Sequence, residues 1–177
     1  GAAEDRDVGT VLAESRRDSD VETRARNAGL AYVELEGDIG VLGNGAGLVM
    51  ATMDQIETAG GAAANFCDIG GGAGAARVKV ALSLITSSPR VAAVLVNVFG
   101  GITRCDEVAR GLLEAFAATC LEVPVVVRLD GNVGDEGRAI LAAGQVPGVT
   151  IAASPAEAVR LVVAAARDAA ATPGAEV

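Results

Sequence analysis

Apolar residues recur with two different spacings along this chain, and the spacings divide it into strands and helices. Residues 30–35 (Leu-Ala-Tyr-Val-Glu-Leu) are mostly apolar at alternate positions, and residues 39–42 form a second short apolar run after a turn at Glu36-Gly-Asp. A period of two residues is typical of a strand with one buried face. The two runs therefore predict a hairpin at the start of the folded region.

Further along the chain, short apolar runs alternate with stretches whose apolar residues recur every three or four positions. The runs at residues 65–69, 91–98 and 123–127 predict buried strands, and Pro124 is tolerated near the start of the last one. The other stretches predict amphipathic helices. Their buried stripes are expected to be Val49, Met53 and Ile56; Val78, Ala81, Leu82 and Ile85; Val108, Leu112, Ala115 and Phe116; and Val159, Val162, Val163 and Ala166.

The last helix has the clearest start signal. Ser154 occupies the N-cap, Pro155 the first helical position, and Glu157 the capping-box position. Because strands that alternate with helices pair in parallel through right-handed crossovers, the pattern predicts the α/β class. The expected architecture is a flavodoxin-like, doubly wound and mainly parallel sheet of about five strands, with helices on both faces.

The two ends of the chain differ from this regular part. Residues 1–29 are polar and charged, with a short helix predicted from Asp20 to Arg26. They carry too little apolar surface to fold alone, so we interpret them as a linker or the remnant of a preceding domain. Residues 30–171 form the predicted domain, and residues 172–177 a disordered tail.

Four loops that contain glycine follow predicted strands, at residues 43–47, 70–74, 100–106 and 130–137. The carboxyl ends of parallel strands meet at one edge of a sheet, where α/β proteins bind ligands. Three of these loops carry polar side chains that could touch a ligand, namely Asn44, Thr103 with Arg104, and Asn132. The alternative is that the glycines serve only tight strand–helix turns. Four such loops at one edge favour a binding site.

The loop after residues 65–69 is the strongest candidate for chemistry. The run Asp68-Ile-Gly-Gly-Gly joins a strand to a helix, so backbone N–H groups can face outward where the helix macrodipole is positive. This geometry suits a phosphoryl or carboxylate group. Asp68 is expected to brace the loop through backbone N–H groups. Asp106 is expected to cap a helix from Cys105 to Thr119.

Composition removes several classes of chemistry. The chain has 177 residues, a net charge of −9, 2% aromatic residues and no histidine. These features argue against nucleic-acid binding and exclude a Ser-His-Asp mechanism. The chain has no Gly-Lys-Ser/Thr motif of a P-loop, and the glycines of residues 43–47 lack the spacing of a dinucleotide fingerprint. Any reaction here therefore depends on backbone dipoles or on residues of another chain.

Cysteine usage and hydropathy indicate the compartment. Cys67, Cys105 and Cys120 have neither a CxxC nor a metal-ligand spacing, so we expect free thiols in a reducing cytosol and no metal site. No apolar stretch reaches the roughly 18 residues of a membrane span, and the first residues lack the apolar core of a signal peptide. We expect an intracellular chain that binds neither membranes nor nucleic acid.

Four segments resemble, in the same order, the β subunit of succinyl-CoA synthetase, the ADP- or GDP-forming succinate–CoA ligase. They are residues 40–54 (GVLGNGAGLVMATMD), 65–73 (NFCDIGGGA), 94–106 (VLVNVFGGITRCD) and 124–132 (PVVVRLDGN). The resemblance spans about Leu30 to Ala166. In that family an N-terminal ATP-grasp domain holds ATP or GTP with magnesium, and a flavodoxin-like domain follows it. The chain resembles only the second domain, which implies a truncated or split product without a cofactor of its own.

The resemblance also implies a reaction and a partner. The family converts succinate, CoA and NTP into succinyl-CoA, NDP and phosphate, a step of the tricarboxylic acid cycle, through a phosphorylated histidine of the α subunit. That α subunit, in an αβ or (αβ)₂ assembly of the bacterial cytoplasm, is the implied partner and the main CoA-binding chain. The present chain alone is expected to be inactive.

Site residues follow from the matching motifs. By resemblance, the N-terminus of the helix that faces the phosphohistidine is formed by Gly70, Gly71 and Gly72. The positions that match the family's carboxylate-substrate site are Asn44, Gly101, Ile102 and Thr103.

Thr103 departs from the family, which carries an aliphatic residue at this position. Its hydroxyl could read a hydroxy-acid such as malate, so a malate- or citrate-CoA ligase subunit stays open as an alternative. Two others are a non-catalytic flavodoxin-like module that binds a small anion or acyl-CoA, and a role limited to subunit contacts.

Overall fold

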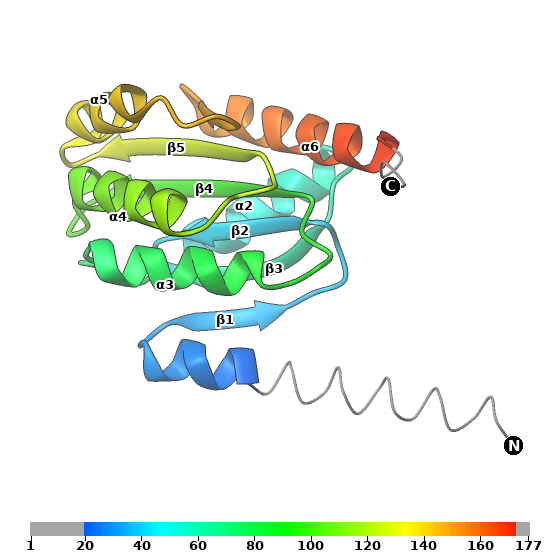
Figure 1. Cartoon of the computed structure of the whole chain (residues 1–177), viewed down its shortest axis with the longest axis horizontal. Helices are drawn as coiled ribbons and strands as arrows, with labels where there is room; N and C mark the ends of the chain where they lie inside the picture. The colour runs from blue at the N-terminus through cyan, green and yellow to red at the C-terminus, as the bar shows by residue number, and fades with distance from the viewer. Residues whose placement is uncertain (1–19, 173–177) are drawn as a thin grey trace, which may run out of the picture.

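The structure, a computed structural model, describes residues 20–172. Its six strands form one sheet in the order β1-β3-β2-β4-β5-β6, with helices on both faces (Figure 1). The strands are β1 (Ala31–Glu34), β2 (Ile39–Gly43), β3 (Ala63–Asp68), β4 (Ala93–Gly100), β5 (Val125–Gly131) and β6 (Val149–Ile151). A helix over residues 20–27 precedes them, and the other helices are α2 (Ala46–Thr58), α3 (Ala75–Thr86), α4 (Cys105–Ala118), α5 (Gly134–Gly144) and α6 (Pro155–Ala171).

The order of the strands after β1 identifies the topology. Counted along the chain from β2, their spatial order is 2-1-3-4-5, and each neighbouring pair among them is parallel. This is the flavodoxin-like order, in which ligands bind beyond the carboxyl ends of the strands where the order reverses. Here the reversal lies between β2 and β4. The predicted fold class is confirmed, with six strands where about five were expected.

The predicted hairpin of β1 and β2 is wrong. β3 lies between them, antiparallel to β1 and parallel to β2. The connection crosses the start of β3, where Gly37 N donates to Ala63 O at 2.9 Å and Asp38 N donates to Ala62 O at 3.0 Å. A side chain on Gly37 would overlap the Ala62 backbone. The long-range pairing with β3 thus replaces the local pairing that the turn suggested.

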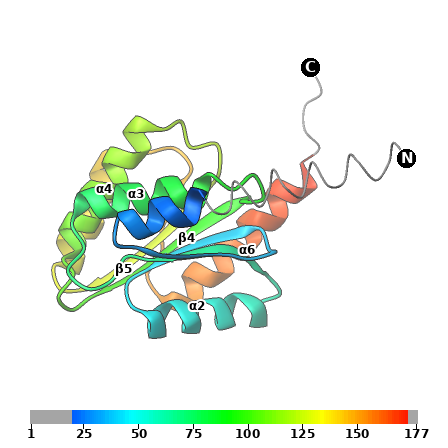
Figure 2. The same ribbon diagram turned by 90° about the horizontal axis from the view of Figure 1, so that it is seen from below.

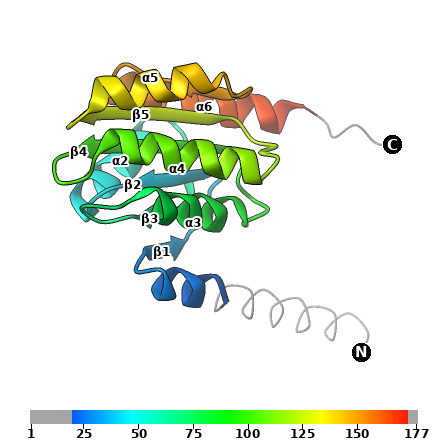
Figure 3. The ribbon, with the colours of Figure 1, turned by 60° about the vertical axis from the view of Figure 1, so that its left-hand side comes forward.

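The two faces of the sheet have separate helical layers. Helices α3 and α4 cover one face, and α2 and α6 cover the other (Figure 2). Helix α5 packs beside α4 (Figure 3). The predicted stripes are buried apart from Met53, which is partly buried while its neighbour Thr52 is enclosed. Within residues 20–172, no helix is long and apolar enough to cross a membrane.

The sequence pattern did not reveal α5 and β6. Helix α5 contains Gly134, Gly137 and Gly144, and Leu141 is its one large buried side chain, so it lacks a periodic stripe. Strand β6 has only 3 residues. Because α5 begins at Gly134, the predicted loop 130–137 is shorter than expected.

The other predicted features of local structure have mixed outcomes. The short helix near Asp20 is confirmed and covers residues 20–27. Ser154 Oγ accepts from Glu157 N at 3.2 Å, so the cap of α6 is confirmed. The three cysteines are free, with Cys67 and Cys105 buried and Cys120 exposed. Residues 1–19 of the predicted linker (1–29) and residues 173–177 of the predicted tail (172–177) lie outside the described residues, and the domain bounds stay a prediction.

Candidate functional site

The four loops meet at the carboxyl edge of the sheet, and hydrogen bonds join them. Asn44 Nδ2 donates to Phe99 O at 2.7 Å, and Asn44 Oδ1 accepts from Phe99 N at 2.9 Å. Asp68 Oδ1 accepts from Gly45 N at 2.7 Å and from Gly70 N at 2.8 Å. The first pair ties the loop after β2 to the end of β4, and the second ties it to the loop after β3. The predicted brace by Asp68 is confirmed.

Two further links complete the edge. Gly72 N donates to Thr103 Oγ1 at 3.0 Å, which joins the loops after β3 and β4. Asn132 contacts the loop after β4 through its backbone, because its N donates to Gly100 O at 2.7 Å and its O accepts from Cys105 N at 3.1 Å. The convergence of all four loops is therefore confirmed.

The helices that start at this edge differ in how their N-termini are neutralised. Helix α6 has the Ser154 cap, and α4 and α5 carry acidic residues in their first turns. Helices α2 and α3 have neither a side-chain cap nor an acidic residue in the first turn. Of these two ends, that of α2 is met by Asp68, which accepts from the N-cap amide of Gly45, whereas the positive end of α3 has no carboxylate of the described chain on its helix amides.

The start of α3 lies slightly beyond the predicted position. Gly70, Gly71 and Gly72 form a turn, and the helix begins at Ala75 with Gly74 as its N-cap. The amides of Gly70 and Gly72 are used within the chain. Among residues 20–172, no acceptor is found for the amides of Gly71, Ala73, Gly74, Ala75 and Ala76. Five backbone donors in this segment therefore have no partner within the described chain, and only one of them belongs to the glycine triplet.

Helix α4 fixes the position of this N-terminus. A methyl group on Gly111 of α4 would come within 2.6 Å of Ala75 O, so the first residue of α3 packs directly on the α4 backbone. Close approach of this kind holds the donors of α3 rigidly in place.

The residues assigned to carboxylate binding lie beside α2 and α3. Asn44 is half-buried, and both polar ends of its amide already bind Phe99. Gly101 is open, and Ile102 is 85% exposed. Thr103 is only 1% exposed, and its hydroxyl points at Gly72.

A buried arginine at this edge escaped the sequence analysis. Arg128 on β5 is 8% exposed; its Nη1 donates to Asn97 Oδ1 at 3.3 Å and its Nη2 to Asp130 Oδ2 at 3.1 Å. Its guanidinium also lies 5.8 Å from the ring centre of Phe99. Asn97 in turn donates to Thr52 Oγ1 at 2.9 Å. The sequence did offer a signal for this cluster, because Asn97 lies within the apolar run 91–98 and Arg128 directly follows the apolar run 123–127.

Asp106 does not cap α4 as predicted. The N-cap position is Arg104, which makes no side-chain cap, and Asp106 lies inside the first turn. Its carboxylate forms ion pairs at 3.1 Å with Arg104 and with Arg110. Hydrogen bonds from Arg104 hold the pKa of Asp106 below its ordinary value, against the opposing effect of burial.

A pH-dependent stability test follows from this pairing. A carboxylate whose pKa is lowered by folding stabilises the native state above its unfolded pKa of about 4, and the stabilisation is lost as pH falls through the folded value. Asp106→Asn should therefore lower the free energy of unfolding at pH 7, and the difference from the unmodified chain should shrink below about pH 4. Urea unfolding at several pH values measures this difference in the free energy of unfolding. Asp54→Asn, at an exposed carboxylate, is the control, and a pH-independent difference would contradict the assignment.

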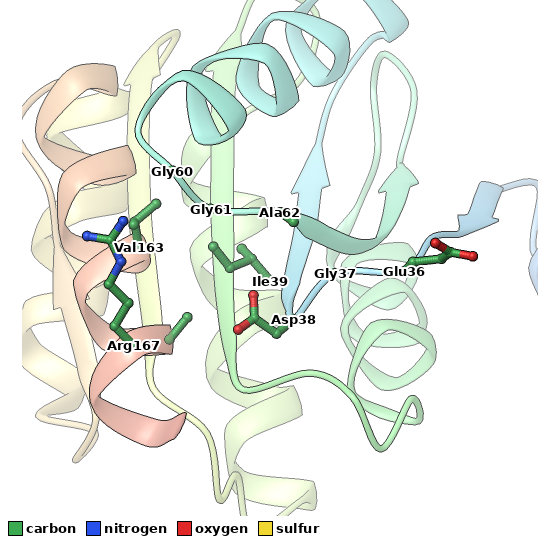
Figure 4. Close-up of a pocket in the computed structure, with 10 residues that line it drawn as sticks. Glu36, Gly37, Asp38, Ile39, Gly60, Gly61, Ala62, Val163 and Arg167 are labelled. Atoms are coloured by element: carbon green, nitrogen blue, oxygen red, sulfur yellow. The ribbon is translucent and has the colours of Figure 1, made fainter. Parts of the chain in front are cut away.

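A cavity at the opposite end of the sheet is separate from these loops. It has a volume of about 390 Å³ and lies between the end of α2 and α6, with Asp38 and Arg167 on its walls (Figure 4). It contains none of the predicted site residues. Within the described part of the chain, no group of three or more Cys, Asp or Glu side chains is placed to hold a metal ion.

Comparison with known proteins identifies the family. The CoA-ligase family profile matches residues 42–165. The chain belongs to the CoA-ligase family. The match covers the four loops, so this CoA-ligase chain carries the carboxyl edge as part of its family core.

Curated relatives of this CoA-ligase chain are β subunits of ADP-forming succinate–CoA ligase. The Rubrobacter xylanophilus protein is 52% identical over 147 residues, which are 83% of this chain and 38% of the relative. The Chloroflexus aurantiacus protein is 51% identical over 158 residues, or 89% of this chain and 40% of the relative. The chain thus spans about two fifths of these relatives.

Solved structures support the fold of this CoA-ligase chain. A Methanosaeta concilii ATP citrate lyase has a TM-score of 0.61 at 19% identity, over 76% of this chain and 38% of that one. A Pyrococcus horikoshii protein has a TM-score of 0.64 at 15% identity, over 78% of this chain and 37% of that one. At such low identity these matches concern the fold alone.

Proposed function

We propose that this chain is the C-terminal part of the β subunit of a succinate–CoA ligase. In this role it supplies the site for the carboxylate substrate and the helix end that faces a phosphohistidine of an α subunit. The nucleotide, ATP or GTP with magnesium, binds to a preceding ATP-grasp domain, and CoA binds mainly to the α subunit. The whole reaction converts succinate, CoA and NTP into succinyl-CoA, NDP and phosphate.

One observation carries the proposal. The N-termini of α2 and α3, which follow the neighbouring strands β2 and β3, are the two at this edge without a side-chain cap of their own or a first-turn acid. The chain is 51–52% identical to two succinate–CoA ligase β subunits, and this similarity supports assigning these helix ends to phosphoryl and carboxylate groups. The sequence has no histidine, so a phosphorylated histidine has to come from outside these residues.

The two positive ends have separate tasks in this proposal. The free amides of Gly71, Ala75 and Ala76 bind the phosphoryl oxygens, and the α3 dipole stabilises their charge. Well-aimed donors in a water-excluding site are worth about 3 kcal/mol each in transition-state stabilisation. The loop at Gly101–Thr103 and the end of α2 hold the carboxylate, with Asn44 fixing the loop through Phe99.

Reconstitution tests the proposed function. The full-length β subunit mixed with its α subunit should transfer phosphate from NTP to α and then form succinyl-CoA, whereas this chain with α should give neither product. Labelled phosphate on α and thioester formation are the measurements. Malate and citrate, offered in place of succinate, test the other acids. Thioester formation by this chain alone, or a full-length assembly that leaves α unphosphorylated, would contradict the proposal.

A further inference from the structure

We infer that Thr103 is a positioning residue, which acts on the phosphoryl site through the amide of Gly72. This inference rests on the proposed function and names a residue that sets the geometry of the turn at Gly70, Gly71 and Gly72, which we call the glycine corner. Thr103 Oγ1 accepts from Gly72 N at 3.0 Å, across the gap between the loops after β3 and β4. An aliphatic side chain at this position has no acceptor for that amide.

The bond divides the glycine corner into held and free donors. Gly70 N is held by Asp68 at 2.8 Å and Gly72 N by Thr103, while Gly71 N between them has no acceptor among the described residues. Gly70 and Gly72 both adopt positive φ, at 71° each. Two fixed amides on either side therefore determine where the Gly71 N–H group points, which is the preorganisation that a catalytic donor requires.

Burial of the Thr103 hydroxyl favours this positioning role over direct contact with a bound substrate. Thr103 is 1% exposed, whereas its neighbour Ile102 is 85% exposed and Gly101 is open. A hydroxy-acid bound at the exposed part of this loop meets the backbone of Gly101 and Ile102 before it meets the Thr103 hydroxyl. The side chain thus faces the glycine corner and not the carboxylate.

The first test measures the bond in this chain. Thr103→Val keeps the side-chain shape and removes the acceptor, so hydrogen exchange at the Gly72 amide should become at least about tenfold faster. Exchange at Gly70, which Asp68 holds, should stay within about twofold. Thr103→Ser should restore protection at Gly72. Thr150→Val, the same change at an exposed position of β6, is the matched control. Unchanged exchange at Gly72 in a folded Thr103→Val chain would overturn the inference.

The second test uses the full-length subunit assembled with its α partner. Thr103→Val should slow NTP-dependent phosphorylation of α about tenfold, because small displacements of catalytic groups are costly. The KM for succinate should stay within about twofold, and Thr103→Ser should restore the rate. A purely structural defect would slow phosphorylation and weaken succinate binding together, and it would affect Thr103→Val and Thr103→Ser alike.

The outcomes distinguish the inference from the function on which it rests. No phosphorylation by the unmodified assembly would overturn the proposed function, and the catalytic part of this inference with it. An active assembly in which Thr103→Val phosphorylates α normally would overturn the inference alone. A changed ratio of succinate to malate turnover with normal phosphorylation would also overturn it, in favour of direct substrate reading.

Discussion

Replacement of Ala76 by glutamate is expected to slow phosphoryl transfer by at least about a hundredfold while slightly stabilising the fold. Ala76 is exposed in the first turn of α3, and its amide has no acceptor within the described chain. A carboxylate there occupies the positive helix end and repels a phosphoryl group. Two like charges about 4 Å apart interact by about 4 kcal/mol at an effective dielectric constant of about 20. The expected loss of rate is therefore roughly a hundredfold to a thousandfold.

Stability should change in the opposite direction to activity. An acidic residue in the first turn of a helix typically contributes about 0.3–1 kcal/mol. Urea unfolding of Ala76→Glu should show this gain, and phosphorylation of α in the full-length assembly should show the loss. Ala76→Gln, which has nearly the same shape without the charge, should keep most of the activity. Equal losses in both variants would mean that bulk, and not charge, is responsible.

The second large effect is expected at Gly131, where the loops after β4 and β5 meet. Gly131 pairs with Gly100 and has a φ of 88°. A side chain at Gly131 would press on the Gly100 backbone, within 2.9 Å of its nitrogen. The left-handed conformation costs about 1–2 kcal/mol, and overpacking adds about 1–3 kcal/mol. Gly131→Ala should therefore lower the free energy of unfolding by about 2–5 kcal/mol.

Gly148 provides the matched control for this change. Its φ of 79° is similar, but a side chain there would meet nothing within 4 Å. Gly148→Ala should lower the free energy of unfolding by only about 1–2 kcal/mol, which is the cost of the backbone conformation alone. Chemical denaturation of the two variants separates strain from overlap. Similar losses in both would contradict the close packing of β4 and β5 at this edge.

The sequence predicted the features that depend on local spacing. The buried face of α3 followed from apolar residues at helical intervals, and Ser154 with Glu157 marked the start of α6. The meeting of the four loops also followed, because parallel strands place their carboxyl ends at one edge. These predictions needed no knowledge of which residues touch across the fold.

The features that were missed or wrong depend on contacts between distant residues. The partner of β1 is set by the crossing at Gly37 and Ala62, which a local turn signal does not contain. Helix α5 was missed because its buried positions are mainly glycine. The role of Arg128 depends on Asn97, 31 residues away along the chain. Which amides stay free at the glycine corner likewise depends on Asp68 and Thr103.

The most direct test is a titration of this chain with inorganic phosphate, followed by amide chemical shifts. We expect weak, millimolar-range binding, since in the proposed function the rest of the site belongs to the α subunit, with the largest shifts at Gly71, Ala75 and Ala76. Ala76→Glu should remove these shifts. Phosphate-induced shifts centred elsewhere, or unchanged in Ala76→Glu, would contradict the claim that the uncapped end of α3 is the anion site.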